Sequence, residues 1–260
     1  MAANWLILLW HLYFSTFDML YNLSKRIYII RLAILIFSTI TFVTVKAQDS
    51  SYTRPAVTDK YDIYKQQVAK DSFKKMIELK TMEPGIAYDL RYASTNNFMH
   101  RLMYPANTNI TFLRVPAAIA LQKVQKELNQ MGLGLKIFDA YRPYSVTVKF
   151  WELVKDERYV VNPSKGSGHN RGTTVDLTII NLQTRAALNM GTDFDNFSDT
   201  AHHSFTKLPE EILQNRMLLK STMEKYGFKA YNEEWWHYSL ADAAKFELLD
   251  IDFKKLQKSL

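Results

Sequence analysis

Cysteine is absent from the 260-residue sequence, which excludes disulfide bonds and thiolate metal ligands. Internal repeats and low-complexity tracts are also missing. The formal net charge is +7, but no stretch interleaves lysine and arginine with aromatic residues to make a basic binding stripe. We therefore expect no nucleic-acid partner.

The first 47 residues have the layout of a secretory signal peptide. Basic residues precede an apolar run from Leu32 to Val45, and small residues near Ala47 suit a cleavage site. The run is short for a membrane span, which needs about 20 apolar residues; an uncleaved anchor is the alternative. Met19 is an alternative start of the chain. We expect secretion across the inner membrane into the periplasm, with no stable membrane association after cleavage.

Residues 48–58 are polar and predict a linker, and residues 59–260 are long enough for a single domain with its own core. Helical patterns cover 61–75, 116–131, 145–156 and 208–226, and strand patterns cover 85–92, 135–138, 173–180 and 231–238. Helices and strands alternate irregularly, which predicts an α+β fold with a central, mainly antiparallel sheet and flanking helices. The expected buried stripes are Ile119, Val124, Leu128 and Met131 in one helix, and Ile212, Leu219, Met223 and Tyr226 in another.

Two separated segments carry a candidate metal site, Ser167-Gly-His-Asn-Arg-Gly-Thr-Thr-Val-Asp176 and Glu234-Trp-Trp-His237. His169, Asp176 and His237 supply imidazole and carboxylate ligands that suit one zinc ion and leave a fourth position open for water. We expect His169 on a glycine-rich loop and Asp176 on the following strand, with Thr174, Asp176 and Thr178 on a polar face turned to the site. The alternative is that these histidines are ordinary core residues.

Glu234 lies three positions before His237, where it could take a proton from a metal-bound water. A regular strand over 231–238 would turn Glu234 and His237 to opposite faces, so this role requires a bulge or bend near Glu234.

Arg142 and Asp195 are candidates with simpler alternatives. Arg142 follows a short strand and precedes Pro143, so its guanidinium could stabilise an oxyanion, or could merely pair with Asp139. Asp195 could hold a substrate ammonium group, or could cap a loop turn. We interpret His202 and His203 as solvated loop residues, and Trp235 and Trp236 as core residues and site wall.

Together, the Ser-Gly-His-x6-Asp block, the Glu-x-x-His block and Asp139-Ala-Tyr-Arg-Pro143 resemble the zinc-dependent D-alanyl-D-alanine dipeptidases, the family of the vancomycin-resistance dipeptidase. That family is related to D,D-carboxypeptidases and to hedgehog-like domains. The resemblance extends to the blocks 89–98 and 190–197, and it spans about residues 77–240.

The resemblance implies that His169, Asp176 and His237 bind one zinc ion per chain. It makes Glu234 the catalytic base and acid and Arg142 the oxyanion stabiliser, with Ser167 and Asp195 at the two ends of a small D,D-dipeptide. The expected activity is therefore that of a metallopeptidase acting on cell-wall-derived dipeptides. A periplasmic D,D-carboxypeptidase or endopeptidase, and a non-catalytic zinc-containing binding module, are the alternatives.

Overall fold

The computed structural model describes Leu23, Lys25 and residues 52–258, so almost all of the predicted signal peptide and residues 48–51 of the predicted linker lie outside the described residues. Within the unit from Tyr52 onward, a five-stranded sheet lies at the centre. Its strand order is β3 (Ala87–Tyr88), β5 (Leu133–Asp139), β6 (Thr174–Asn181), β8 (His237–Leu240) and β7 (Phe228–Ala230). Within this central sheet only the β3–β5 pair is parallel, so the prediction of an α+β fold with a mainly antiparallel sheet is confirmed.

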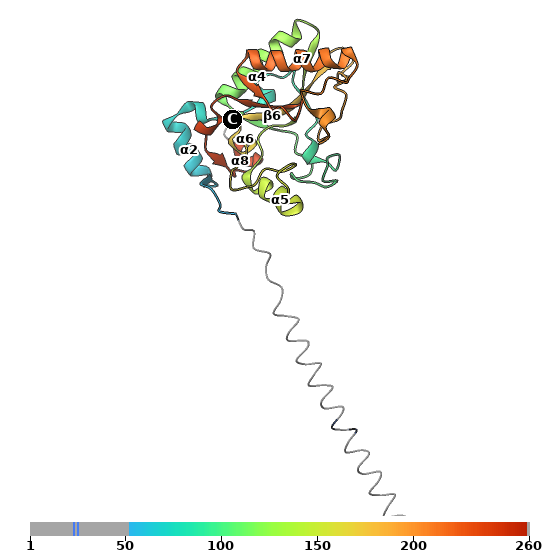
Figure 1. Ribbon diagram of the computed structural model, residues 1–260. Coiled ribbons are helices and arrows are strands. Elements are labelled where there is room, and N and C mark those ends of the chain that lie inside the picture. Colours follow the sequence, from blue (N-terminus) through green and yellow to red (C-terminus); the bar gives the residue numbers. More distant parts are fainter. Residues whose placement is uncertain (1–22, 24, 26–51, 259–260) are drawn as a thin grey trace, which may run out of the picture. The chain divides into compact units, whose positions relative to one another are not determined.

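Helices α4 (Val115–Asn129) and α7 (Glu210–Lys225) run beside each other against the sheet (Figure 1). In α7, Ile212, Leu219 and Met223 are buried as predicted, because their spacing places them on one face. Two predictions for the other helix are wrong. Ile119 faces outward at 39% exposure, and Met131 is 48% exposed because α4 ends before it, at Asn129.

Shorter helices, α5 (Tyr144–Val154), α6 (Gly168–Arg171) and α8 (Phe253–Gln257), lie away from α4 and α7, below β6 in Figure 1. Helices α2 (Tyr61–Lys70) and α3 (Leu79–Met82) complete the described α-helices of this unit. Helix α2 is shorter than its pattern predicts, because the Asp71 side chain accepts a hydrogen bond from the Phe73 amide and starts a separate 3-10 turn. Among the residues that the structure describes, no helix is both long and apolar enough to cross a membrane.

Two small two-stranded sheets lie outside the central sheet. Strand β1 (Val57–Thr58) pairs in parallel with β9 (Leu248–Leu249), and β2 (Met76–Glu78) pairs antiparallel with β4 (Phe112–Arg114). The end of the predicted linker is thus part of the fold rather than a free connection. The strand predicted over 85–92 is reduced to β3, because a 3-10 turn, Arg91–Ala93, follows it closely.

Strand β6 lies in the middle of the central sheet and carries Asp176. Its residues from Thr174 to Ile180 are all buried, so other elements cover both faces of this strand. On the predicted polar face, Asp176 lines the pocket described below, whereas Thr174 and Thr178 do not.

Candidate metal centre

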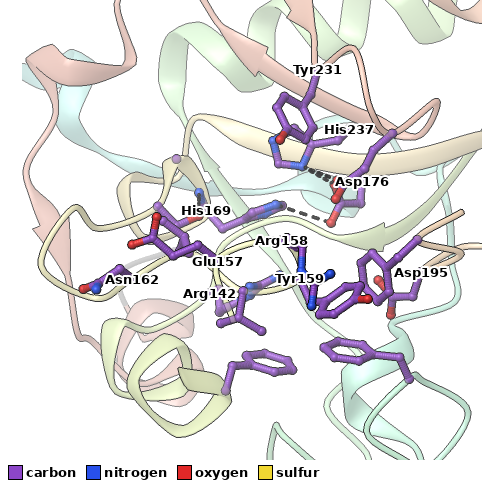
Figure 2. Close-up of a pocket in the computed structure, with 18 of the residues that line it drawn as sticks. Arg142, Glu157, Arg158, Tyr159, Asn162, His169, Asp176, Asp195, Tyr231 and His237 are labelled. Carbon is purple, nitrogen blue, oxygen red and sulfur yellow. Dashed lines mark hydrogen bonds and ion pairs between the residues drawn. The ribbon is translucent and has the colours of Figure 1, made fainter. Parts of the chain in front are cut away.

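A pocket of about 360 Å³ opens beside β6, α6 and β8, and it contains all seven residues predicted for the site (Figure 2). These are Arg142, Ser167, His169, Asp176, Asp195, Glu234 and His237. They come from segments spread over almost a hundred positions of the sequence, so their meeting is a property of the tertiary fold.

Strand pairing brings two of the expected metal ligands together. Asp176 of β6 and His237 of β8 are direct cross-strand partners, so their side chains project from the same face of the sheet. His237 Nδ1 lies 2.9 Å from Asp176 Oδ1, and His169 Nε2 lies 3.3 Å from Asp176 Oδ2. One ligand atom from each of the three residues falls within 4.8 Å of the other two, and Figure 2 shows the three side chains turned toward one another.

The chemistry of these three groups fits a divalent metal ion. Asp176 is 3% exposed, and its Oδ1 has no geometrically acceptable hydrogen bond despite the short approach of His237. A buried carboxylate oxygen left this way is costly unless a cation binds it. His169 Nδ1 lies 2.7 Å from the Ala140 carbonyl oxygen, which makes Nδ1 the protonated nitrogen and leaves Nε2 with a lone pair toward Asp176. This arrangement suits zinc, with an outer carbonyl orienting one ligand.

His169 does not lie on a loop, as the glycine-rich sequence predicted, but on the short helix α6. Ser167 and Asn170 form a reciprocal capping box at its start, and Gly172, with φ of 69°, ends it in the left-handed conformation. A Cβ atom on Gly168 would lie 1.9 Å from Thr174 Oγ1, so only glycine allows α6 to approach β6 this closely. The glycines thus shape a helix turn that sets His169 against Asp176.

Glu234 lies in a tight turn between β7 and β8 rather than on the strand predicted over 231–238. The Glu234 amide donates to the Tyr231 carbonyl, and the His237 amide donates to the Glu234 carbonyl, so the backbone reverses around this residue. As a result, Glu234 Oε2 lies 3.4 Å from His237 Nδ1, and both side chains line the pocket. The bend that a catalytic role required is present.

Neighbouring charges and burial act in opposite directions on the pKa values of Asp176 and His237. Burial opposes the charge of Asp176, but the two histidines beside it outweigh that effect and hold its pKa below the usual value. Burial likewise opposes protonation of His237, but Asp176 raises the pKa of this imidazole overall. Burial raises the pKa of Glu234, which therefore binds a proton more readily than an exposed glutamate does.

Arg142 both lines the pocket and forms the carboxylate pair that was its alternative interpretation. Its Nη2 and Nε both donate to Asp139 Oδ2, at 2.7 and 3.0 Å, and these two charge-assisted hydrogen bonds to one oxygen hold the guanidinium in place. Burial opposes the charge, yet Asp139 raises the pKa of Arg142 well above its ordinary value. The Arg142 side chain also packs against the rings of Tyr92 and Phe150, 5.1 and 4.9 Å from their centroids. The cation is thus permanent and rigidly held.

Asp195 also lines the pocket, below Asp176 in the view of Figure 2. The Tyr92 hydroxyl lies 3.1 and 3.2 Å from its two carboxylate oxygens. Burial and the charge of Asp176 raise the pKa of Asp195 well above the ordinary value, although Arg142 acts in the opposite direction. Asp195 forms no ion pair with the residues that the structure describes.

Ser167 is committed mainly to α6, because its Oγ accepts a hydrogen bond from the His169 amide at 3.2 Å. Its hydroxyl proton is still free to point into the pocket. Trp235 and Trp236 are buried as predicted, at 2% and 1% exposure. The prediction that His203 is solvated is wrong, because this residue is half-buried against Tyr238 and burial lowers its pKa to about 4.

Some residues that contribute to the site could not be recognised from the sequence pattern. Tyr92 and the carbonyl of Ala140 orient site residues from distant or adjacent segments, and only their membership of the resembling blocks could have marked them. One wall of the pocket comes from the irregular segment 157–166, including Arg158 and Tyr159, which has no periodic pattern.

Comparisons with known proteins identify the family of this chain. The profile of the D-ala-D-ala dipeptidase family, Peptidase_M15, matches residues 71–259. A D-alanyl-D-alanine dipeptidase of Escherichia coli is 33% identical over 179 residues, which cover 69% of this chain and 91% of that protein. One of Enterococcus faecalis is 32% identical over 182 residues, covering 63% of this chain and 90% of that protein.

Among solved structures, the LD-carboxypeptidase LdcB matches with a TM-score of 0.33 and 22% identity over 52% of this chain and 62% of its own. The vancomycin-resistance D,D-pentapeptidase VanY, in complex with Zn(II), has a TM-score of 0.33 and 14% identity over 58% and 86%. The match of the family profile over most of the described chain, and the identity to curated relatives, show that this chain belongs to the D-ala-D-ala dipeptidase family.

Proposed function

We propose that this protein is a zinc-dependent dipeptidase that hydrolyses D-alanyl-D-alanine. The observation that carries the proposal is the convergence of His169, Asp176 and His237 on one point of the pocket, with the half-buried carboxylate of Glu234 beside them. The names of the relatives support the substrate.

His169, Asp176 and His237 would hold the zinc ion. Bound zinc supplies a water molecule whose pKa falls from about 15.7 toward ~7, which makes hydroxide accessible at neutral pH. Glu234 accepts the proton of that water and later returns it to the leaving amine. The raised pKa of Glu234 suits both steps, because a general acid–base group works best near the ambient pH.

Arg142 stabilises the negative charge that develops on the carbonyl oxygen. Its guanidinium is fixed by Asp139 and stacked between aromatic rings, so it needs little reorganisation during the reaction. Donors held in this way contribute about 10²–10³ in rate.

The two ends of the dipeptide bind to different residues in this proposal. Asp195, half-buried and outside any ion pair among the described residues, accepts the substrate ammonium group, with Tyr92 holding the carboxylate in place. Ser167 donates its hydroxyl proton toward the substrate carboxylate. An ammonium-binding carboxylate inside a pocket of about 360 Å³ favours a free dipeptide over the end of a longer peptide.

A comparison of free D-Ala-D-Ala with its N-acetylated form tests this substrate assignment. Acetylation removes the ammonium charge and with it the interaction with Asp195, so we expect kcat/KM to fall. Each 1.4 kcal/mol of lost interaction corresponds to a fall of about tenfold. Preference for the blocked peptide would instead show a D,D-carboxypeptidase or endopeptidase. Zinc binding without turnover of either peptide would show a non-catalytic module.

The role of Glu234 is tested by Glu234→Gln, which keeps the shape of the side chain but removes its basicity. We expect zinc to remain bound while kcat falls by about 10²–10⁴. Glu233→Gln is the matched control, because Glu233 is the adjacent exposed residue, accepts only a hydrogen bond from Tyr231 and lies outside the pocket lining. Equal activity of the two variants would remove Glu234 from the mechanism.

We also propose that the protein is exported and acts in the periplasm. The basic and apolar pattern of the first 47 residues supports export. Cell fractionation and N-terminal sequencing of the mature protein test it: we expect a chain that begins near Gln48, and an uncut chain in the membrane fraction would show an anchor.

A further inference from the structure

Arg216 of α7 is a buried cation on the side of the protein away from the pocket. It is 4% exposed, its Nε donates to the Met190 carbonyl at 2.7 Å, and its Nη1 donates to the His202 carbonyl at 3.2 Å. Its Nη2 is buried and has no hydrogen-bond partner. Buried arginine is rarely found without a counter-charge, because removing a full charge from water costs several kcal/mol.

The other buried arginines show what Arg216 lacks. Arg114 lies 3.8 Å from a carboxylate oxygen of Glu247, and Arg142 pairs with Asp139 at 2.7 Å. No carboxylate of the described chain lies within ion-pair distance of Arg216. Burial lowers the pKa of Arg216, and the only ionisable group that acts against this effect is the Tyr238 phenol.

Two further polar atoms next to Arg216 are also without partners. The Tyr238 hydroxyl is fully buried, and the Nε2 atom of His203 is buried as well. The rings of these two residues lie 6.1 Å apart, and Arg216 bonds to the carbonyl of His202, the residue next to His203. Tyr238 follows His237 in β8, so its side chain leaves the opposite face of the sheet from the metal ligands and points under α7. All three orphaned groups can donate a hydrogen bond.

We propose that Arg216, Tyr238 and His203 bind a small inorganic anion of halide size, chloride being the abundant one. Three buried donors without partners, one of them on a permanently cationic group, match an anion, whereas a metal cation would be repelled. Of the two charged groups of α7 beyond Arg216 that act here, Lys220 acts on His203 and Glu224 on Tyr238, and these two form an ion pair at 3.9 Å, so Arg216 carries the uncompensated charge.

The surroundings limit the size of this anion. A Cβ atom added to Gly191 would lie 3.4 Å from Arg216 Nη2 and 3.0 Å from Ile212 Cγ2, so the space beside the guanidinium is narrow and partly apolar. A single-atom anion fits such a space more readily than sulfate or phosphate does.

The position of the anion gives it a structural consequence. Arg216 joins the backbone at Met190 to the backbone at His202, and the His203 amide donates to the Asn232 carbonyl. These segments lead into Asp195 on one side and Glu234 on the other, so the anion would brace the loops of the catalytic pocket from behind. It would touch neither substrate nor reacting atoms.

Thermal unfolding of the mature protein in sodium chloride or sodium bromide, compared with sodium gluconate at equal ionic strength, tests the proposal. We expect the halides to raise Tm in a saturable way, by about 2–4 °C at 150 mM. In Arg216→Met this halide-specific rise should vanish. In Lys220→Met, which removes a neighbouring but more exposed cation, it should persist.

Tyr238→Phe serves if Arg216→Met does not fold, because it removes one donor and little volume; its half-saturating halide concentration should rise by about tenfold, the effect of losing one such hydrogen bond. Crystals soaked in bromide should show an anomalous peak beside Arg216 Nη2. Equal Tm in halide and gluconate, an unchanged halide response in Tyr238→Phe, or a bromide-soaked crystal with no peak there would overturn the proposal.

Discussion

Replacing Asp139 by asparagine is the sharpest test of how the site is supported. The side chains of Asp139 and Arg142 are 1% and 12% exposed, and Asp139 also accepts hydrogen bonds from the Tyr104 hydroxyl and the Ala140 amide. Asparagine would present an NH₂ group to donors and leave the guanidinium charge without its counter-charge. Breaking a buried pair in this way costs about 3–5 kcal/mol.

For a unit of this size each kcal/mol corresponds to about 2–4 °C, so we expect the Tm of Asp139→Asn to fall by about 6–20 °C. Hydrolysis should fall as well, by about 10²–10³ in kcat, because Arg142 would lose its fixed orientation. Circular dichroism melts and a dipeptide hydrolysis assay at a temperature where the variant is folded measure the two effects separately.

Asp156→Asn is the matched control for stability. Asp156 forms an ion pair of the same type with Arg158 at 2.5 Å, but Arg158 is 77% exposed, and solvent screens such pairs. We expect its Tm to equal that of the unmodified protein. If Asp139→Asn melts no lower than Asp156→Asn, the reasoning that burial makes the first pair essential is refuted.

Three further outcomes follow from the same structure. Gly168→Ala should lower Tm and weaken zinc binding measured by equilibrium dialysis, since its Cβ would lie 1.9 Å from Thr174 Oγ1 and overpacking costs about 1–3 kcal/mol. Chelation of zinc should lower Tm reversibly, because the carboxylate of Asp176 would lose its cation while buried; an unchanged melt would argue against the site. Burial opposes the charge of Glu247, but Lys74 lowers the pKa of this carboxyl overall, so its stabilisation is present above about pH 4.5 and is lost as pH falls through the folded pKa. Urea unfolding at pH 7 and pH 3 should therefore show a smaller acid-induced loss for Glu247→Gln than for the unmodified protein, and identical losses would contradict this assignment.

Some expectations for the site depend only on side-chain chemistry and on the local sequence. The ligand types at His169, Asp176 and His237 follow from the chemistry of imidazole and carboxylate, and the β-branched run after Gly172 indicates the strand that carries Asp176. Alternation in the strand and helical spacing in α7 are local properties, since each depends only on neighbouring residues.

Local patterns failed where a turn or a close approach overrides them. The segment around Glu234 alternates like a strand, but its backbone amides form turn hydrogen bonds instead. The glycines before Asp176 indicate a loop, whereas the cap from Ser167 and Asn170 makes a helical turn. In both cases hydrogen bonds within three or four residues form the alternative conformation, and the pattern of apolar residues and glycines does not report them.

The sequence by itself determined which groups this protein offers to a metal ion and to a substrate, and which stretches form its helices and strands, because these depend on side-chain chemistry and on short-range periodicity. Only the tertiary structure decided that Tyr92 meets Asp195 across 103 positions, that Arg142 is held by Asp139, and that Arg216 is buried without a carboxylate. Such partners are selected by the packing of the whole chain around the sheet, since a buried charge can be satisfied from any segment that folding brings within reach.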